Sequence, residues 1–164
     1  MTPLRWRSGP RCARSSATRL DRALPARPSF NQVTSIQPEL WVESPRKALS
    51  FYAAAFGARV LHQVGEADDI VAQLAAGDAT FWVASTSEEM RRFSPRAIDG
   101  ATCRLLLVVD DPDSVVGQAV AAGATESSPV GEEHGWLLGR IMDPFGHEWE
   151  IGKPLGAWPR SGHT

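Results

Sequence analysis

The 164-residue sequence lacks several features that would indicate a particular class of protein. Its two cysteines, Cys12 and Cys103, are too few for a disulfide framework and show no metal-ligand spacing. No apolar run approaches the roughly 18 residues that a membrane-spanning helix needs, so we expect a soluble protein with no membrane partner. The sequence also lacks a glycine-rich phosphate loop, a serine nucleophile elbow and a cysteine–histidine pair.

What is present fits one globular domain with an uneven distribution of charge. Hydrophobic residues make up 43% of the chain and charged residues 22%, which suffices to build a core. The net charge of −2 is the sum of two unlike parts. Residues 1–29 hold seven arginines and one aspartate, giving +6, whereas residues 30–164 hold ten basic and 18 acidic residues, giving −8. An acidic domain of this kind is not expected to bind nucleic acid.

Residues 1–29 are predicted to be a disordered leader. The segment is rich in arginine, proline and serine and has no apolar period, so it cannot offset the entropy of becoming ordered. We favour a start codon placed upstream of the true one; an organelle transit peptide and a nucleic-acid-binding arm are the alternatives. Because the segment has no apolar core of a secretory signal, we expect the protein in the cytoplasm.

The rest of the chain is predicted to contain a βαβββ motif twice. In the first unit, Ser44-Pro45 begins a helix that Gly57 ends. In the second unit, Asp111-Pro112 begins a helix that Gly123 ends. The alternation of apolar residues predicts strands at 36–42, 58–62, 69–75 and 79–85, and again at 104–109, 125–130, 136–142 and 148–152.

The two units are related by an offset of 66 residues, which aligns Phe56-Gly57-Ala58 with Ala122-Gly123-Ala124. The predicted fold class is therefore α+β, with units at 36–86 and 101–153 joined by a linker at 87–100. We place the domain at 30–156 and a flexible C-terminus at 157–164. Two small sheets of this kind must pack together, and we expect a concave cleft between them.

Two motifs resemble the vicinal-oxygen-chelate superfamily. The run Glu43-Ser44-Pro45-Arg46-Lys47-Ala48-Leu49-Ser50-Phe51-Tyr52 resembles its first helix, and Asp143-Pro144-Phe145-Gly146-His147-Glu148-Trp149-Glu150 resembles its closing hairpin. That superfamily includes glyoxalase I, the bleomycin- and mitomycin-binding resistance proteins and the extradiol dioxygenases. The resemblance covers about residues 36–153, and it implies a glyoxalase/bleomycin-resistance-type fold that forms a homodimer.

The resemblance also implies four positions for a divalent metal in the concave sheet. Carried over to this sequence they fall on Gln37, Trp82, Arg104 and Glu150. Gln37 and Glu150 can ligate a metal, but an indole offers only its N–H, and a guanidinium has no lone pair and repels a dication. We therefore expect no metal cofactor; the alternative is a divalent metal held by Gln37 and Glu150 with further ligands that remain unassigned.

The same positions predict a site for a small organic ligand. Alternation along the first strand places Gln37, Glu39 and Trp41 on one face, and a bidentate, buried Arg104–Glu150 pair is expected to anchor a ligand or to be purely structural. Tryptophan stacks on planar molecules and attracts cations, although these rings would equally serve to fill the core. The predicted ligand-binding residues are Gln37, Glu39, Trp41, Trp82, Arg104, Trp136 and Glu150.

The histidines are weaker candidates. His147 is expected to face the helix and stabilise the hairpin, as Trp149 does, because both alternate with Glu148 and Glu150. His134 lies in a predicted loop that would form a lid, and His62 would act as a general base only if it reached the cleft. No catalytic residue is assigned.

Taken together, the sequence predicts a glyoxalase/bleomycin-resistance-like protein that binds a planar or cationic small molecule in its cleft without a catalytic metal. Two alternatives remain open. One is a metal-dependent lyase or dioxygenase of the same superfamily. The other is a non-catalytic scaffold whose cleft serves only dimerisation.

Overall fold

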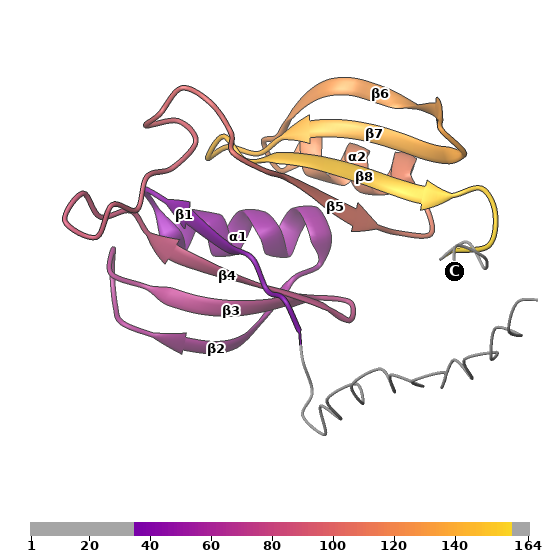
Figure 1. The fold of residues 1–164 in the computed structure, drawn as a ribbon. Helices are drawn as coiled ribbons and strands as arrows, with labels where there is room; N and C mark the ends of the chain where they lie inside the picture. Colours follow the sequence, from indigo (N-terminus) through magenta and orange to yellow (C-terminus); the bar gives the residue numbers. More distant parts are fainter. Residues whose placement is uncertain (1–34, 159–164) are drawn as a thin grey trace, which may run out of the picture. The chain divides into compact units, whose positions relative to one another are not determined.

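The computed structural model describes residues 35–158, so the predicted leader and the last six residues of the predicted C-terminus lie outside the described residues. Among the described residues, no helix has the length and apolar character needed to cross a membrane. Two four-stranded sheets, each with one helix, make up the structure (Figure 1). The two sheets have the same strand connectivity.

The two units follow one topology. The first unit consists of β1 (Glu39–Val42), α1 (Pro45–Phe56), β2 (Arg59–Val64), β3 (Val71–Ala76) and β4 (Ala79–Ser85), in the sheet order β1-β4-β3-β2. The second consists of β5 (Arg104–Val108), α2 (Pro112–Ala121), β6 (Thr125–Glu133), β7 (Trp136–Met142) and β8 (Glu148–Pro154), in the order β5-β8-β7-β6. In each sheet the first strand is parallel to the last, and the other pairs are antiparallel. The predicted α+β fold of two tandem βαβββ units is confirmed.

The helices begin and end close to the predicted residues. Each has a proline in its first turn, and Gly57 ends α1 in the left-handed conformation at φ 62°. The Asp111 side chain caps α2 by accepting a hydrogen bond from the Ser114 N–H at 3.1 Å. Ser44 occupies the corresponding position before α1, but its hydroxyl makes no cap hydrogen bond.

The strand predictions differ from the structure mainly at their ends. The first strand begins at Glu39 rather than at residue 36, and β8 extends two residues beyond the predicted end at 152. β6 continues to Glu133 rather than stopping at residue 130, because a tight turn at His134 and Gly135, both with positive φ, lets Glu133 pair with Trp136. This turn replaces the loop that was predicted to act as a lid.

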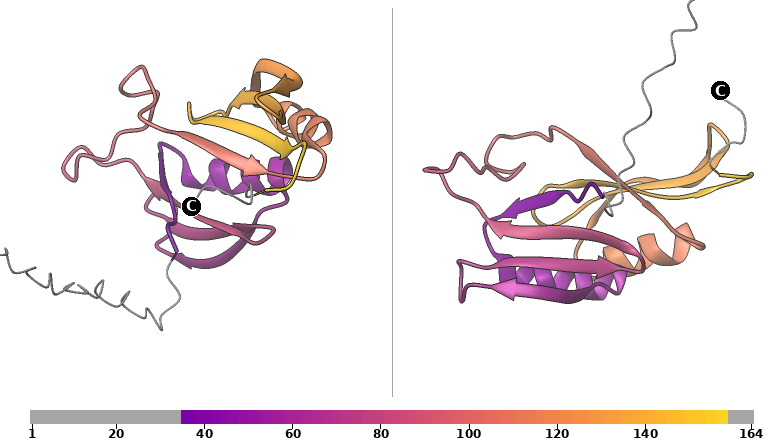
Figure 2. Two further views of the ribbon diagram at one scale, coloured as in Figure 1. Left: turned by 45° about the vertical axis from the view of Figure 1, so that its right-hand side comes forward. Right: turned by 60° about the horizontal axis from the view of Figure 1, so that its bottom comes forward.

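One face of each sheet is covered by its helix and the other is open (Figure 2). In β1, Leu40 and Val42 are buried on the helix side, whereas Trp41 between them is only half-buried. In β4, Phe81 and Val83 alternate in the same way with Trp82. The alternation therefore places both tryptophans on the open face, and they do not fill the core between sheet and helix.

A buried carboxylate joins the two units. Asp143, in the turn between β7 and β8, is 2% exposed. Its Oδ2 accepts hydrogen bonds from the Tyr52 hydroxyl at 2.7 Å and from the Trp149 indole at 3.1 Å. Its Oδ1 accepts from the backbone N–H groups of Phe145 and His147, both at 2.9 Å. The aspartate thus ties α1 of the first unit to the hairpin of the second.

His147 lies in the same junction. Its side chain is buried, and its Nε2 lies 3.2 Å from the backbone oxygen of Trp41 in β1. The imidazole therefore links the closing hairpin of the second unit to the first strand of the first unit. This is the structural role that alternation predicted.

Tyr52 gives the fold a measurable alkaline pH dependence. Burial, together with the charge of Asp143, raises the pKa of Tyr52 well above its ordinary value. Because the folded state holds the tyrosine proton more tightly than the unfolded state does, the protonated Tyr52 stabilises the fold. This stabilisation is complete below the unfolded pKa of about 10 and is lost as the pH rises through the folded pKa. We expect the free energy of unfolding to fall more steeply above about pH 10 in the native protein than in Tyr52→Phe.

Denaturant unfolding of both proteins between about pH 8 and about pH 11 measures this difference. The chain has a single tyrosine, so tyrosinate absorbance reports directly on Tyr52. Equal pH dependence of the two proteins, or ionisation of Tyr52 at its ordinary pKa in the folded state, would contradict the prediction.

Candidate functional site

The open face of the first sheet carries five side chains that we call the tryptophan cluster: Gln37, Glu39, Trp41, Gln73 and Trp82. Strand register places Trp82 opposite Glu39 on one side and opposite Gln73 on the other. The Trp82 indole donates to the Gln37 Oε1 at 2.9 Å, and the Trp41 indole donates to the Glu39 Oε1 at 2.9 Å. Both indole rings are therefore held in place by polar neighbours while one side of the cluster stays open.

Gln37 is the central acceptor of the tryptophan cluster. Its Oε1 receives the Trp82 indole and also the Gln73 amide, at 2.8 Å. Its own amide nitrogen donates to the Ser35 hydroxyl at 3.1 Å. A carbonyl oxygen has two lone pairs, so both are already used by donors from the protein.

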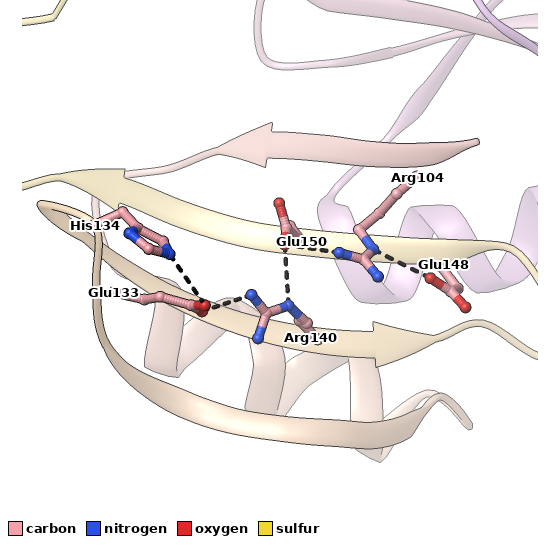
Figure 3. A network of polar contacts seen from close by, with 6 residues as sticks. All are labelled: Arg104, Glu133, His134, Arg140, Glu148 and Glu150. Atoms are coloured by element: carbon pink, nitrogen blue, oxygen red, sulfur yellow. Dashed lines mark hydrogen bonds and ion pairs between the residues drawn. The ribbon is translucent and has the colours of Figure 1, made fainter.

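The open face of the second sheet carries a second cluster, the ion network, made of Arg104, Glu133, Arg140, Glu148 and Glu150 (Figure 3). Arg104 reaches Glu148 and Glu150, each at 3.1 Å, and Arg140 reaches Glu150 at 3.0 Å and also Glu133. The five charges alternate in sign across β5, β8, β7 and β6. The predicted Arg104–Glu150 contact is present, but it is not bidentate, because Arg104 divides its donors between two carboxylates.

The network is also less buried than predicted. The Arg104 side chain is 48% exposed and that of Glu150 is 21% exposed. Hydrogen bonds to Glu133 and Glu150 raise the pKa of the Arg140 guanidinium, so Arg140 is charged at any accessible pH. Since exposed ion pairs contribute only about 0–1 kcal/mol each, the network orients its charges more than it stabilises the fold.

The remaining predicted residues, one tryptophan and two histidines, belong to neither cluster. Trp136 packs against Trp158 with ring centroids 4.8 Å apart, and the two line a cavity of about 510 Å3 beyond the ion network. His62 lies in β2 opposite Gln73, beside the tryptophan cluster. His134 is 88% exposed at the β6–β7 turn, with its Nε2 3.7 Å from Glu133. The predicted site residues thus fall into two clusters and one separate aromatic pair.

Within residues 35–158, the four positions implied for a metal do not fit one. Gln37 has no free lone pair on its Oε1, and the Oε1 of Glu150 accepts from two guanidinium groups. Trp82 and Arg104 offer no lone pair at all. No group of three histidine, cysteine or acidic side chains in this part of the chain is arranged to hold a metal ion.

Comparisons of the sequence and the fold with known proteins identify the family of this chain. The sequence model of the glyoxalase-like domain matches residues 37–152. The uncharacterized protein MT0910 of Mycobacterium tuberculosis is 30% identical over 155 residues, which covers 90% of this chain and 88% of that protein. This relative supports the family but indicates no ligand.

Solved structures agree with the family match. The crystal structure of TioX from Micromonospora sp. ML1 has 25% identity and a TM-score of 0.58, covering 76% of this chain and 98% of TioX. A glyoxalase/bleomycin resistance protein/dioxygenase family enzyme from Burkholderia phytofirmans PsJN has 19% identity and a TM-score of 0.59, covering 74% of this chain and all of that one (100%). This second likeness concerns the fold alone. Because the family model spans nearly all of the two βαβββ units, the chain belongs to the glyoxalase-like domain family of the vicinal-oxygen-chelate superfamily.

Proposed function

We propose that this protein binds a small, planar, cationic organic molecule on the open faces of its sheets, without a catalytic metal. The observation that carries the proposal is the pair of half-buried indoles, Trp41 and Trp82, fixed by acceptors on an open sheet face. A ring that is already held in place loses little conformational entropy when a ligand stacks on it. Indole faces also attract cations, and the Glu39 carboxylate adds a negative charge beside them.

The charge of the surroundings supports a cation over an anion. The ion network holds three carboxylates against two guanidinium groups, a balance of −1, and residues 30–164 as a whole carry −8. A field of this sign raises the local concentration of cationic ligands and their rate of association. We infer that the second sheet contributes electrostatic attraction and that the tryptophan cluster contributes contact with the ligand.

We further propose that the protein works as a homodimer in the cytoplasm. Two apolar side chains of β5, Leu106 and Val108, lie beside the ion network and are 46% and 49% exposed. A second chain covering this strand would remove them from water, which is favourable by about 25 cal/mol per Å2.

Quenching of tryptophan fluorescence tests the binding proposal. We expect saturable quenching by a planar cation such as proflavine and much weaker binding of acridine, which has a similar ring system but is neutral at neutral pH. Trp82→Leu removes one stacking surface and is expected to weaken proflavine binding about tenfold. Trp158→Leu, a matched loss of a tryptophan outside both clusters, is the control and should leave the affinity unchanged.

Three results would oppose the proposal. One divalent ion bound firmly per purified chain would favour the metal-dependent lyase or dioxygenase. Variants of the tryptophan cluster that change only the dimerisation constant would favour the scaffold. Equal affinities for proflavine and acridine would show that the positive charge of the ligand does not contribute to binding.

A further inference from the structure

A separate groove lies where the start of α1, the linker between the units and the β7–β8 turn come together. Its volume is about 950 Å3. Three cationic side chains line it: Arg46 and Lys47 from the first turn of α1, and Arg96 from the linker. Pro144 and Phe145 of the β7–β8 turn form part of the opposite wall. None of these residues belongs to the tryptophan cluster or to the ion network.

The walls of this groove are fixed by packing. Ser94 of the linker is completely buried, and its hydroxyl donates to the Glu43 carboxylate and accepts from the Ala97 N–H. The linker then packs directly on the hairpin turn at Gly146, which has φ +91° and where a Cβ would lie 3.1–3.2 Å from atoms of Arg96 and Pro95. The segment that carries Arg96 is therefore held against the turn.

Within residues 35–158, the positive charge of the groove is only partly offset by the protein. Among residues 35–158, no ion pair involves Arg46, Lys47 or Arg96. The one acid in the groove, Glu43, is held by a hydrogen bond from Ser94 and offsets one of the three positive charges, which leaves an excess of positive charge. Two of the cations also stand in the first turn of α1, which has no acidic residue and where the helix dipole disfavours positive charge.

This concentration of basic side chains is unusual in an otherwise acidic part of the chain. Residues 30–164 contain ten basic side chains against 18 acidic ones, and three of those ten line this one groove. The groove also has an apolar component, because Phe51, Ala54 and Phe145 take part in its lining. A ligand that matches both features has a negative head and an apolar body.

We propose that the groove binds a small organic oxyanion, a carboxylate or phosphate carried on an apolar body of aromatic size. The guanidinium groups of Arg46 and Arg96 present planar forks of N–H donors that suit such oxyanions. The Ser44 hydroxyl, which makes no cap hydrogen bond to α1, is free to donate as well. The apolar body lies against Ala54 and against Pro144 of the hairpin turn. The ligand has the opposite charge to the one proposed for the sheets.

An anionic fluorescent probe tests this site in the full chain. Anilinonaphthalene sulfonate combines an oxyanion with an aromatic body, and N-phenyl-naphthylamine is its neutral counterpart. We expect saturable binding of the sulfonate that weakens with added salt, and at least tenfold weaker binding in Arg46→Glu and in Arg96→Glu. Arg59→Glu makes the same change of charge at an exposed position in β2 outside the groove, and it should leave the probe affinity unchanged.

Two further experiments test the charged head and the apolar body of the ligand separately. Displacement of the probe by phenyl phosphate or by benzoate distinguishes a phosphate from a carboxylate head. Ala54→Trp fills the groove without altering its charge and should abolish probe binding, with folding checked by the melting temperature. Equal probe affinity in Arg46→Glu, Arg96→Glu and Arg59→Glu, or equally tight binding of the neutral amine, would overturn the proposal. Neither result depends on proflavine binding at the sheets.

Discussion

Replacing Asp143 by alanine is expected to lower the free energy of unfolding by about 4 kcal/mol. The carboxylate is buried and accepts four hydrogen bonds, two from the side chains of Tyr52 and Trp149 and two from backbone N–H groups. Alanine would leave all four donors without their partner, and each buried donor left unpaired costs about 1–3 kcal/mol before water enters or the turn relaxes. Urea unfolding followed by tryptophan fluorescence measures the loss.

Asparagine at the same position separates shape from hydrogen bonding. In Asp143→Asn the Oδ1 can still accept from the backbone of the turn, but an amide nitrogen faces the donors from Tyr52 and Trp149. We expect a loss of about 2 kcal/mol, smaller than for alanine. Asp110→Ala, which removes an exposed aspartate after β5, is the control and should change stability by about 0.5 kcal/mol or less. A similar effect of Asp143→Ala and Asp110→Ala would show that the buried carboxylate does not hold the junction.

Replacing Trp149 by alanine is expected to cost about 3–5 kcal/mol. This side chain belongs to β8 but packs on aromatic rings of the first unit, with centroid distances of 4.8 Å to Phe56, 5.8 Å to Tyr52 and 5.9 Å to Phe81. Its removal would open a cavity at the contact between the two units. The units are expected to share one cooperative unfolding transition, because their buried residues form one core.

Phenylalanine at this position keeps most of the packing and removes only the indole N–H. Trp149→Phe is therefore expected to cost about 1–2 kcal/mol, the worth of a hydrogen bond to a charged group with a small loss of volume. Calorimetry and urea unfolding check both the size of the loss and the number of transitions. Two separate transitions in the native protein, or equal losses for alanine and phenylalanine, would contradict this description of the junction.

Local signals were sufficient to predict the architecture. Helix starts at Ser44-Pro45 and Asp111-Pro112, and glycines after both helices, define the two units because capping and proline geometry act within a few residues. The strands at 79–85 and 136–142 have the predicted bounds. Alternation with Glu148 and Glu150 also assigned Trp149 of β8, and His147 just before this strand, to the buried side, as observed.

The partners of these residues were not predictable in the same way. Alternation placed Glu148 beside Glu150, yet the contact between Arg140 and Glu150 depends on the register of β7 against β8, which no local pattern specifies. Gln73 joins the tryptophan cluster for the same reason, through the pairing of β3 with β4. Asp143 reads locally as a turn residue, and only its contact with Tyr52, 91 residues away, makes it central.

The junction also means that the two halves of the duplication are no longer equivalent. Counted from the helix starts, α1 begins at Pro45 and buries Tyr52 seven residues later, whereas α2 begins at Pro112 and buries Ala119 seven residues later. The β7–β8 turn has room for Asp143, whereas the β3–β4 turn has only two residues. One copy carries the hydroxyl and the other the acid, so a chain built from either copy used twice would bury one group without the other.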